Sequence, residues 1–80
     1  MKYVYVYTLD ELLTINKDKI KITSEKNVVY LLSENGIDMT IHIDNLGTII
    51  EFIIENENSI SCYSENFGLF YFPKWAVKKL

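Results

Sequence analysis

The chain has 80 residues, a formal net charge of −3 at pH 7 and an apolar content of 49%, and all of its eight basic residues are lysine. The missing arginines and the acidic balance argue against direct nucleic-acid binding. Cys62 is the only cysteine, so no internal disulfide forms and a reducing cytoplasm is the expected location. No apolar run approaches the ~20 residues of a membrane helix, so no membrane association is predicted.

The length predicts a single compact domain over 1–80. A chain this short buries only ~60% of the surface that its unfolded form exposes, so its core must be dense. Eleven isoleucines and ten Phe or Tyr residues supply that density without disulfides.

The first predicted strand spans 2–7, where tyrosine and valine alternate with a period of two. One face carries Tyr3, Tyr5 and Tyr7, and the other carries Val4 and Val6. The pattern leaves open which of the two faces is turned to the core.

A short helix is predicted next, over about 9–15. Thr8 and Glu11 have the spacing of a capping box, in which the Thr8 hydroxyl accepts from the Glu11 amide and the Glu11 carboxylate accepts from the Thr8 amide. Leu9, Leu12 and Leu13 fall on one helical face, which we expect to dock on the sheet. The polar residues 16–18 end the helix.

Three strands should follow, over 19–23, 28–33 and 37–44, with a turn over 24–27. The Asn35-Gly36 pair predicts a two-residue hairpin turn of type I′ before the third strand, because both residue types tolerate positive φ. Alternation in this third strand places four side chains inward: Ile37, Met39, Ile41 and Ile43.

The strand over 48–55 is rich in β-branched and aromatic residues and is flanked by turn residues, which predicts the central strand of the sheet. Ile50, Phe52 and Ile54 form its inward face. Its other face is mixed: Ile49, Glu51, Ile53 and Glu55. Strands over 59–64 and 69–72 follow, then Pro73 ends the last strand and a helical turn is predicted over 74–80.

Together these elements predict an α+β fold that is mainly β. It is an antiparallel meander of five to seven short strands, with one short N-terminal helix and a C-terminal helical turn. The sheet is expected to stay open and curled or to close into a small barrel. The mixed second face of the central strand favours the open sheet.

Residues that carry chemistry are few. His42 is the only histidine, and Thr40 and Asp44 share its face, but three residues of one strand do not make the geometry of nucleophilic catalysis. One His and one Cys cannot supply a zinc site, and Cys62 falls at an inward position. Four carboxylates are candidates for binding a hard cation, but such residues more often form the solvent-exposed face of a sheet: Asp38, Asp44, Glu51 and Glu55. No enzyme, metal or cofactor is predicted.

Tyrosine usage is the strongest functional signal. Tyrosine rings combine a large apolar area with a polar tip and are enriched in protein interfaces. The alternative is that cross-strand tyrosines only stabilise a thin sheet, by ~0.2 to 1 kcal/mol per pair. The predicted partner-binding residues are Tyr3, Tyr5, Tyr7, Tyr63, Tyr71 and Trp75, with Glu51 and Glu55 beside them.

The leading hypothesis is a small non-enzymatic protein that occludes a larger partner protein stoichiometrically. Its size, and an amino-acid composition rich in Ile, Lys, Asn and Tyr that is typical of an AT-rich genome, suggest a phage or mobile-element inhibitor of a bacterial defence system, in an anti-CRISPR-like role. The alternative is a small-ligand binder that sequesters a nucleotide. It would stack bases on Tyr or Trp75, would hold phosphate with Lys17, Lys19, Lys21 or Lys26, and would require a homo-oligomer to form a pocket.

Overall fold

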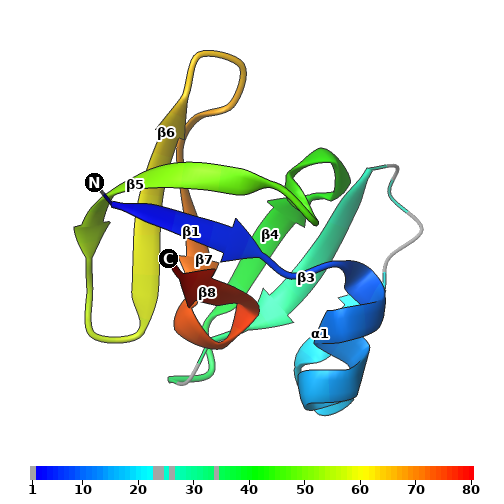
Figure 1. The fold of residues 1–80 in the computed structure, drawn as a ribbon. Helices are drawn as coiled ribbons and strands as arrows, with labels where there is room; N and C mark the ends of the chain where they lie inside the picture. Colours follow the sequence, from blue (N-terminus) through cyan, green and yellow to red (C-terminus); the bar gives the residue numbers. More distant parts are fainter. Residues whose placement is uncertain (1, 23–24, 26, 34) are drawn as a thin grey trace.

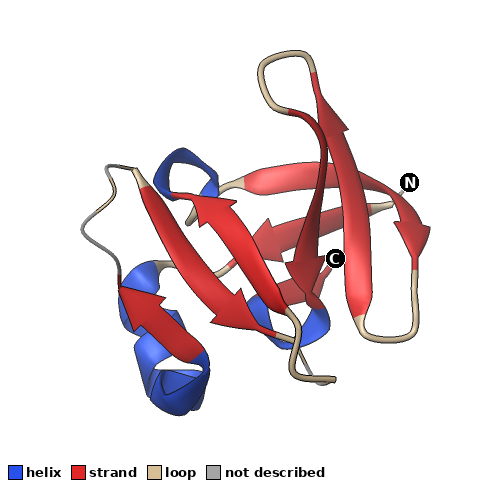
Figure 2. Ribbon diagram, turned by 180° about the vertical axis from the view of Figure 1, so that it is seen from behind, coloured by secondary structure: helices blue, strands red, loops and turns tan. Residues whose placement is uncertain are grey.

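The computed structural model describes residues 2–22, 25, 27–33 and 35–80. Within these residues, eight strands form two antiparallel sheets, one with the order β7-β6-β5-β1-β8 and one with the order β2-β3-β4 (Figure 1, Figure 2). The predicted α+β, mainly β class is confirmed, and the described sheets do not close into a barrel. The strands are β1 Tyr3–Val6, β2 Ile20–Ile22, β3 Val28–Leu32, β4 Asp38–His42, β5 Ile49–Glu55, β6 Ser59–Ser64, β7 Gly68–Pro73 and β8 Val77–Lys79.

The helix α1, Leu9–Asn16, begins with the predicted capping box. The Glu11 amide donates to Thr8 Oγ1 at 3.2 Å, and the Thr8 amide donates to Glu11 Oε1 at 3.0 Å. Leu12 is fully buried. Leu13, which was expected to dock with it, is exposed, so the docking face is narrower than predicted. None of the described helices is long and apolar enough to span a membrane.

The predicted central strand is indeed central, because β5 is the third of the five strands in the larger sheet. β5, β6 and β7 form a meander, and β2, β3 and β4 form another. The order departs from a simple meander at β1, which lies between β5 and β8 and so brings the two ends of the chain together (Figure 1).

The core lies between the two sheets, and the valine face of β1 points into it. Val4 and Val6 have no exposed surface, so the tyrosines of this strand are turned the other way. The buried apolar side chains are Val4, Val6, Leu12, Val29, Leu31, Ile41, Phe52, Ile60, Cys62, Phe72, Ala76 and Val77.

A β-bulge interrupts β5. Phe52 pairs with Cys62, but Ile54, two residues further on, pairs with Ser61, only one residue from Cys62. The extra residue shifts the alternation of the strand. The prediction that Ile54 faces inward with Phe52 is therefore wrong, and 55% of the Ile54 surface is exposed.

The hairpin between β3 and β4 is present, but its turn is not the predicted type I′. Gly36 has a φ of +80°. The Ser33 amide donates to the Ile37 carbonyl at 2.9 Å, and the Gly36 amide donates to the Ser33 carbonyl at 3.0 Å. Three positions therefore separate the paired residues, one more than the predicted loop has.

Several expected inward positions near strand ends are exposed. β4 stops at His42 and the chain continues as a 3₁₀ turn, Ile43–Asn45, so alternation no longer applies there. Ile43 is consequently exposed, contrary to the prediction. Ile37 precedes the first residue of β4 and is exposed as well, also contrary to the prediction. For the predicted strand over 19–23 and the turn after it, Thr23, Ser24 and Lys26 lie outside the described residues.

The C-terminal helical turn is confirmed but shorter than predicted. A 3₁₀ turn spans Lys74–Ala76, and the chain then returns as β8 beside β1. The Leu80 amide donates to the Tyr3 carbonyl at 3.0 Å, which fastens the C-terminus to the first strand.

Candidate functional site

The face of the five-stranded sheet that points away from the core, here called the outer face, carries large apolar side chains. Cross-strand pairs share a face of a sheet, so the register sets its members. Its residues are Tyr3, Tyr5, Ile49, Glu51, Ile53, Ile54, Ser61, Tyr63, Leu69, Tyr71 and Lys78.

The exposure of this face is unusual for its composition. Six of its apolar side chains keep between 44% and 64% of their surface exposed: Ile49, Ile53, Ile54, Tyr63, Leu69 and Tyr71. Contiguous apolar surface is typical of interaction sites, whereas single exposed apolar residues need no explanation, so this face is the candidate site.

The register brings these side chains together from three strands. Tyr63 of β6 pairs with Leu69 of β7, and Tyr71 of β7 pairs with Ser61 of β6. Ile53 and Glu51 of β5 line a shallow depression with Tyr63. The apolar centre is therefore contributed by β5, β6 and β7.

Two of the predicted tyrosines are held in internal contacts. The Tyr5 hydroxyl donates to Glu11 Oε1 at 2.5 Å, which ties the sheet to the first turn of α1. Tyr7 meets the Tyr5 ring edge-on, with 5.6 Å between centroids, and packs against the core. Tyr3 pairs with Glu51 at the margin of the apolar centre.

Glu11 is the junction of this network, and its hydrogen bonds hold the pKa of its carboxyl below the ordinary 4.5. The largest cause is the Tyr5 hydroxyl, followed by the Thr8 amide. The same hydrogen bond raises the pKa of Tyr5 above its ordinary 10.0. Both shifts favour the charged carboxylate beside a neutral phenol.

This network predicts an acid-sensitive contribution to stability. A carboxyl whose pKa is lower in the folded state stabilises the fold above its unfolded pKa, and the contribution disappears as the pH falls through the folded pKa. We expect Glu11→Gln to flatten the fall of the melting temperature below about pH 4.5. Thermal melts from pH 7 to pH 2.5 measure this, with the exposed Glu57→Gln as control. If the melting temperature of Glu11→Gln falls at acidic pH as steeply as that of the unmodified protein, the Glu11 carboxylate does not cause the acid sensitivity.

Trp75 and Glu55 lie away from the apolar centre. The Trp75 indole donates from Nε1 to the Leu32 carbonyl at 2.6 Å, and its ring packs against the core, so it links the C-terminal turn to β3. Glu55 contacts the amino groups of Lys74 and Lys79, each at 3.0 Å. The eight predicted residues are thus divided among different parts of the molecule.

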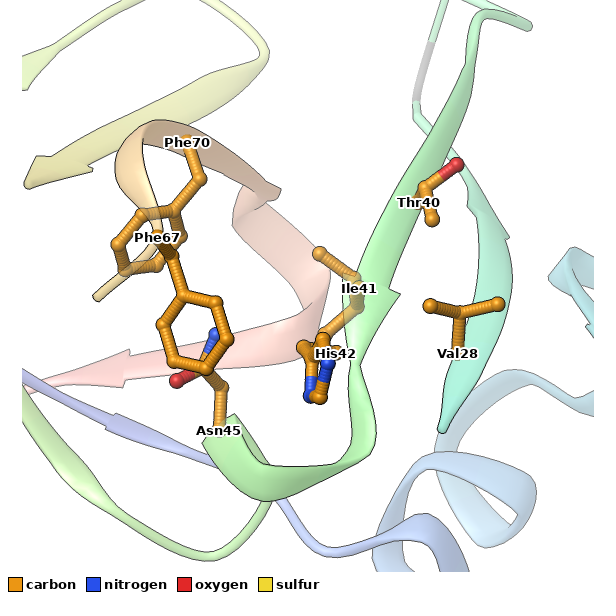
Figure 3. Close-up of a pocket in the computed structure, with 7 residues that line it drawn as sticks. All are labelled: Val28, Thr40, Ile41, His42, Asn45, Phe67 and Phe70. Atoms are coloured by element: carbon orange, nitrogen blue, oxygen red, sulfur yellow. The ribbon is translucent and has the colours of Figure 1, made fainter. Parts of the chain in front are cut away.

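His42 lies in a recess between β4 and the start of β7 (Figure 3). Its ring is 4.7 Å from that of Phe67, and its Nδ1 is 3.6 Å from Asp44 Oδ2. Among the described residues, no hydroxyl donates to this imidazole. The recess has a volume of about 160 Å³ and is lined by Val28, Thr40, Ile41, His42, Asn45, Phe67 and Phe70.

Comparisons with protein family models, with curated proteins and with solved structures found no match.

The remaining reactive groups do not gather into a site in the part of the chain that the structure describes. Within it, no three His, Cys, Asp or Glu side chains are placed to hold a metal ion. Cys62 is fully buried, as predicted, and burial raises the pKa of its thiol to about 11. A neutral thiol is a poor nucleophile and a poor metal ligand.

Sequence reasoning missed four members of the apolar centre. Ile53 and Ile49 were placed on the outer face but were not assigned to the site, although their position beside Glu51 was a usable signal. Ile54 was placed in the core because no residue type reveals the bulge. Leu69 follows directly after a turn, so no earlier strand residue fixes the face to which alternation assigns it.

Proposed function

We propose that this chain is a non-enzymatic binding protein that occludes a larger partner protein stoichiometrically through its outer face. The observation that carries the proposal is the contiguous exposure of six apolar side chains on β5, β6 and β7. A partner surface that covers the half-exposed side chains recovers roughly 1 kcal/mol for each of them by area.

The chemistry of the face suits a protein rather than a small ligand. Tyr63 and Tyr71 are the residue type that interfaces favour, and the surrounding aliphatic side chains exclude water from around them. Glu51 lies beside the apolar centre and Lys78 lies on the last strand of the same face. These charges supply the polar rim that specific interfaces use for orientation.

The nucleotide alternative gains no support from the placement of its residues. Lys17 and Lys19 lie in the 3₁₀ turn after α1, and Lys21 lies on β2 of the smaller sheet. The tyrosines of the outer face lie on the larger sheet, away from these lysines. Tyr30 of β3 pairs with Lys21, but its hydroxyl donates to Glu25 Oε1 at 3.1 Å, which puts a carboxylate where a phosphate would have to bind. The assignment of the partner to a bacterial defence system stays a prediction from size and composition.

Site-specific photo-crosslinking tests the proposal. A benzophenone amino acid replaces Tyr63 on the outer face or, as the matched control, Tyr30 on β3 of the other sheet. In an extract of the natural host, we expect Tyr63 alone to yield a crosslink to one protein, at a fixed stoichiometry in native mass spectrometry. Excess unlabelled chain should compete for it. Equal crosslinking from both positions, or none from Tyr63, would refute the outer face as the binding surface.

A further inference from the structure

The two sheets end in four edge strands, and these fall into two kinds. β2 and β8 have three residues each, and both carry lysine, Lys21 on β2 and Lys78 and Lys79 on β8. Short length and lysine are the usual protection of a sheet edge against pairing with another chain. β4 and β7 have five and six residues and carry no lysine, and β7 has no charged residue at all.

The free backbone groups of β7 follow from its register with β6. The Lys74 amide donates to the Asn58 carbonyl at 3.1 Å, and the register continues through Ser59–Pro73. Because hydrogen-bonded and non-hydrogen-bonded pairs alternate along an antiparallel ladder, Leu69 and Tyr71 direct their amide and carbonyl groups away from β6. Pro73, which lacks an amide, takes the next outward position.

The free groups of β4 follow in the same way. The Ile43 amide donates to the Asn27 carbonyl at 2.7 Å, and the Ser33 amide donates to the Ile37 carbonyl at 2.9 Å. Alternation therefore directs the backbone groups of the even-numbered residues away from β3. These residues are Asp38, Thr40 and His42.

These two unprotected edges face one groove. Its main part has a volume of about 410 Å³ and is lined by Ile37, Asp38, Met39 and Thr40 on one wall and Leu69, Phe70 and Tyr71 on the other. The recess of His42 and Phe67 adjoins it through Thr40 and Phe70 (Figure 3). Across residues 37–42 and 68–73, no hydrogen bond joins β4 to β7.

We propose that this groove binds an extended segment of a partner protein, which adds as a strand to the free edge of β7. Backbone amides and carbonyls at alternate residues are complementary to an extended chain and to no other backbone form. The aromatic recess of Phe67, Phe70 and His42 then receives one side chain of the segment. Asp38 is the one carboxylate in the described lining, so the segment is neutral or basic.

A thin segment fits this place better than the edge of a second folded copy. β4 and β7 draw together where β4 begins and β7 ends, and they diverge toward the other end (Figure 2). A strand needs ~4.8 Å from each neighbouring strand, and Cα atoms of β4 and β7 come within 8 Å of each other, so the segment pairs with β7 where the two strands diverge. The sheet of a second copy would continue past that paired strand into the space that β4 occupies. The proposal uses backbone groups of β7 and does not depend on the outer face being a binding surface.

Removal of one amide tests the pairing with little change to the fold. Cys62 permits ligation of a synthetic 62–80 segment, in which Tyr71 is replaced by the α-hydroxy acid with the same side chain. This change deletes the outward amide of Tyr71. The matched control makes the same change at Lys79, whose amide points off the protected edge of β8, because the Leu80 amide takes the bond to β1.

The probe is a phage-displayed library of random linear eight-residue peptides, selected on the unmodified protein. We expect the enriched peptides to have alternating apolar residues. Their binding to the Tyr71 ester should be about tenfold weaker, as the loss of one buried hydrogen bond implies. Their binding to the Lys79 ester should be unchanged. N-methylation of alternate peptide residues should abolish binding. Failure to enrich any peptide, or equal binding to both esters, would overturn the proposal.

Two further outcomes distinguish this proposal from dimerisation of the protein and from binding at the outer face. If sedimentation shows that the unmodified protein is a dimer and that the Tyr71 ester variant is a monomer, the occupant is a second copy. That result would overturn the proposal of a partner segment. Peptide binding that survives charge substitutions on the outer face supports the groove as a separate site. The groove and the outer face can therefore fail independently.

Discussion

Replacing Ile53 and Tyr63 together with lysine is expected to weaken partner binding at least about a hundredfold, or about 2.7 kcal/mol, while the fold survives. Both side chains are more than half exposed and contribute little to the core. In a complex, two ammonium groups would be buried against a surface that is complementary to apolar side chains, and unpaired buried charge is costly. Titration calorimetry or surface binding assays with the crosslinked partner measure the loss.

The matched control is Ile22→Lys on β2, where 66% of the isoleucine surface is exposed on the other sheet. This variant makes an equal change in charge and apolar area per site, so it should bind as the unmodified protein does. Circular dichroism and melting temperature establish that both variants are folded. Full binding by the double variant, or an equal loss in the control, would contradict the outer face as the binding surface.

Replacing Phe72 with alanine is expected to lower the free energy of unfolding by about 3 to 5 kcal/mol. Phe72 is fully buried, lies opposite Ile60 and meets the ring of Phe70 edge-on at 5.4 Å between centroids. A domain of this size has roughly 4 to 12 kcal/mol of stability in all. The loss therefore consumes much of the stability and should lower the melting temperature by well over 10 °C.

Urea unfolding monitored by the fluorescence of Trp75 measures this loss, since the indole is held against β3 only in the folded state. Tyr71→Ala is the control, because the neighbouring ring on the same strand is 44% exposed and its removal leaves no cavity. We expect that variant to lose less than about 1 kcal/mol. Equal losses at the two positions would mean that β7 does not present Phe72 to the core.

The elements of this protein were largely predictable because their signals are local. The Thr8–Glu11 spacing predicted the capping box, since both hydrogen bonds close within one turn of helix. Alternation predicted most strands, since a strand with one buried face needs a period of two. It failed at Ile54, where a bulge shifts the phase, and at Ile43, where the strand becomes a 3₁₀ turn.

The residue types of the candidate site were predictable, but their positions were predictable only in part. Tyr63 and Tyr71 were assigned to a binding surface, and they lie together on the outer face. Tyr5 and Trp75 were assigned with them, but Glu11 and the Leu32 carbonyl hold their polar atoms. A tyrosine on a wet face and one bonded to a distant carboxylate look the same in a sequence.

The sequence by itself determined the α+β class, the capped helix and most of the strands, because each depends on residues close together in the chain. Only the tertiary structure decided that β1 lies between β5 and β8, that six apolar side chains meet on one outer face, and that the free edges of β4 and β7 share a groove. These features join segments that lie far apart in sequence, and their pairing depends on how the two sheets pack across the core.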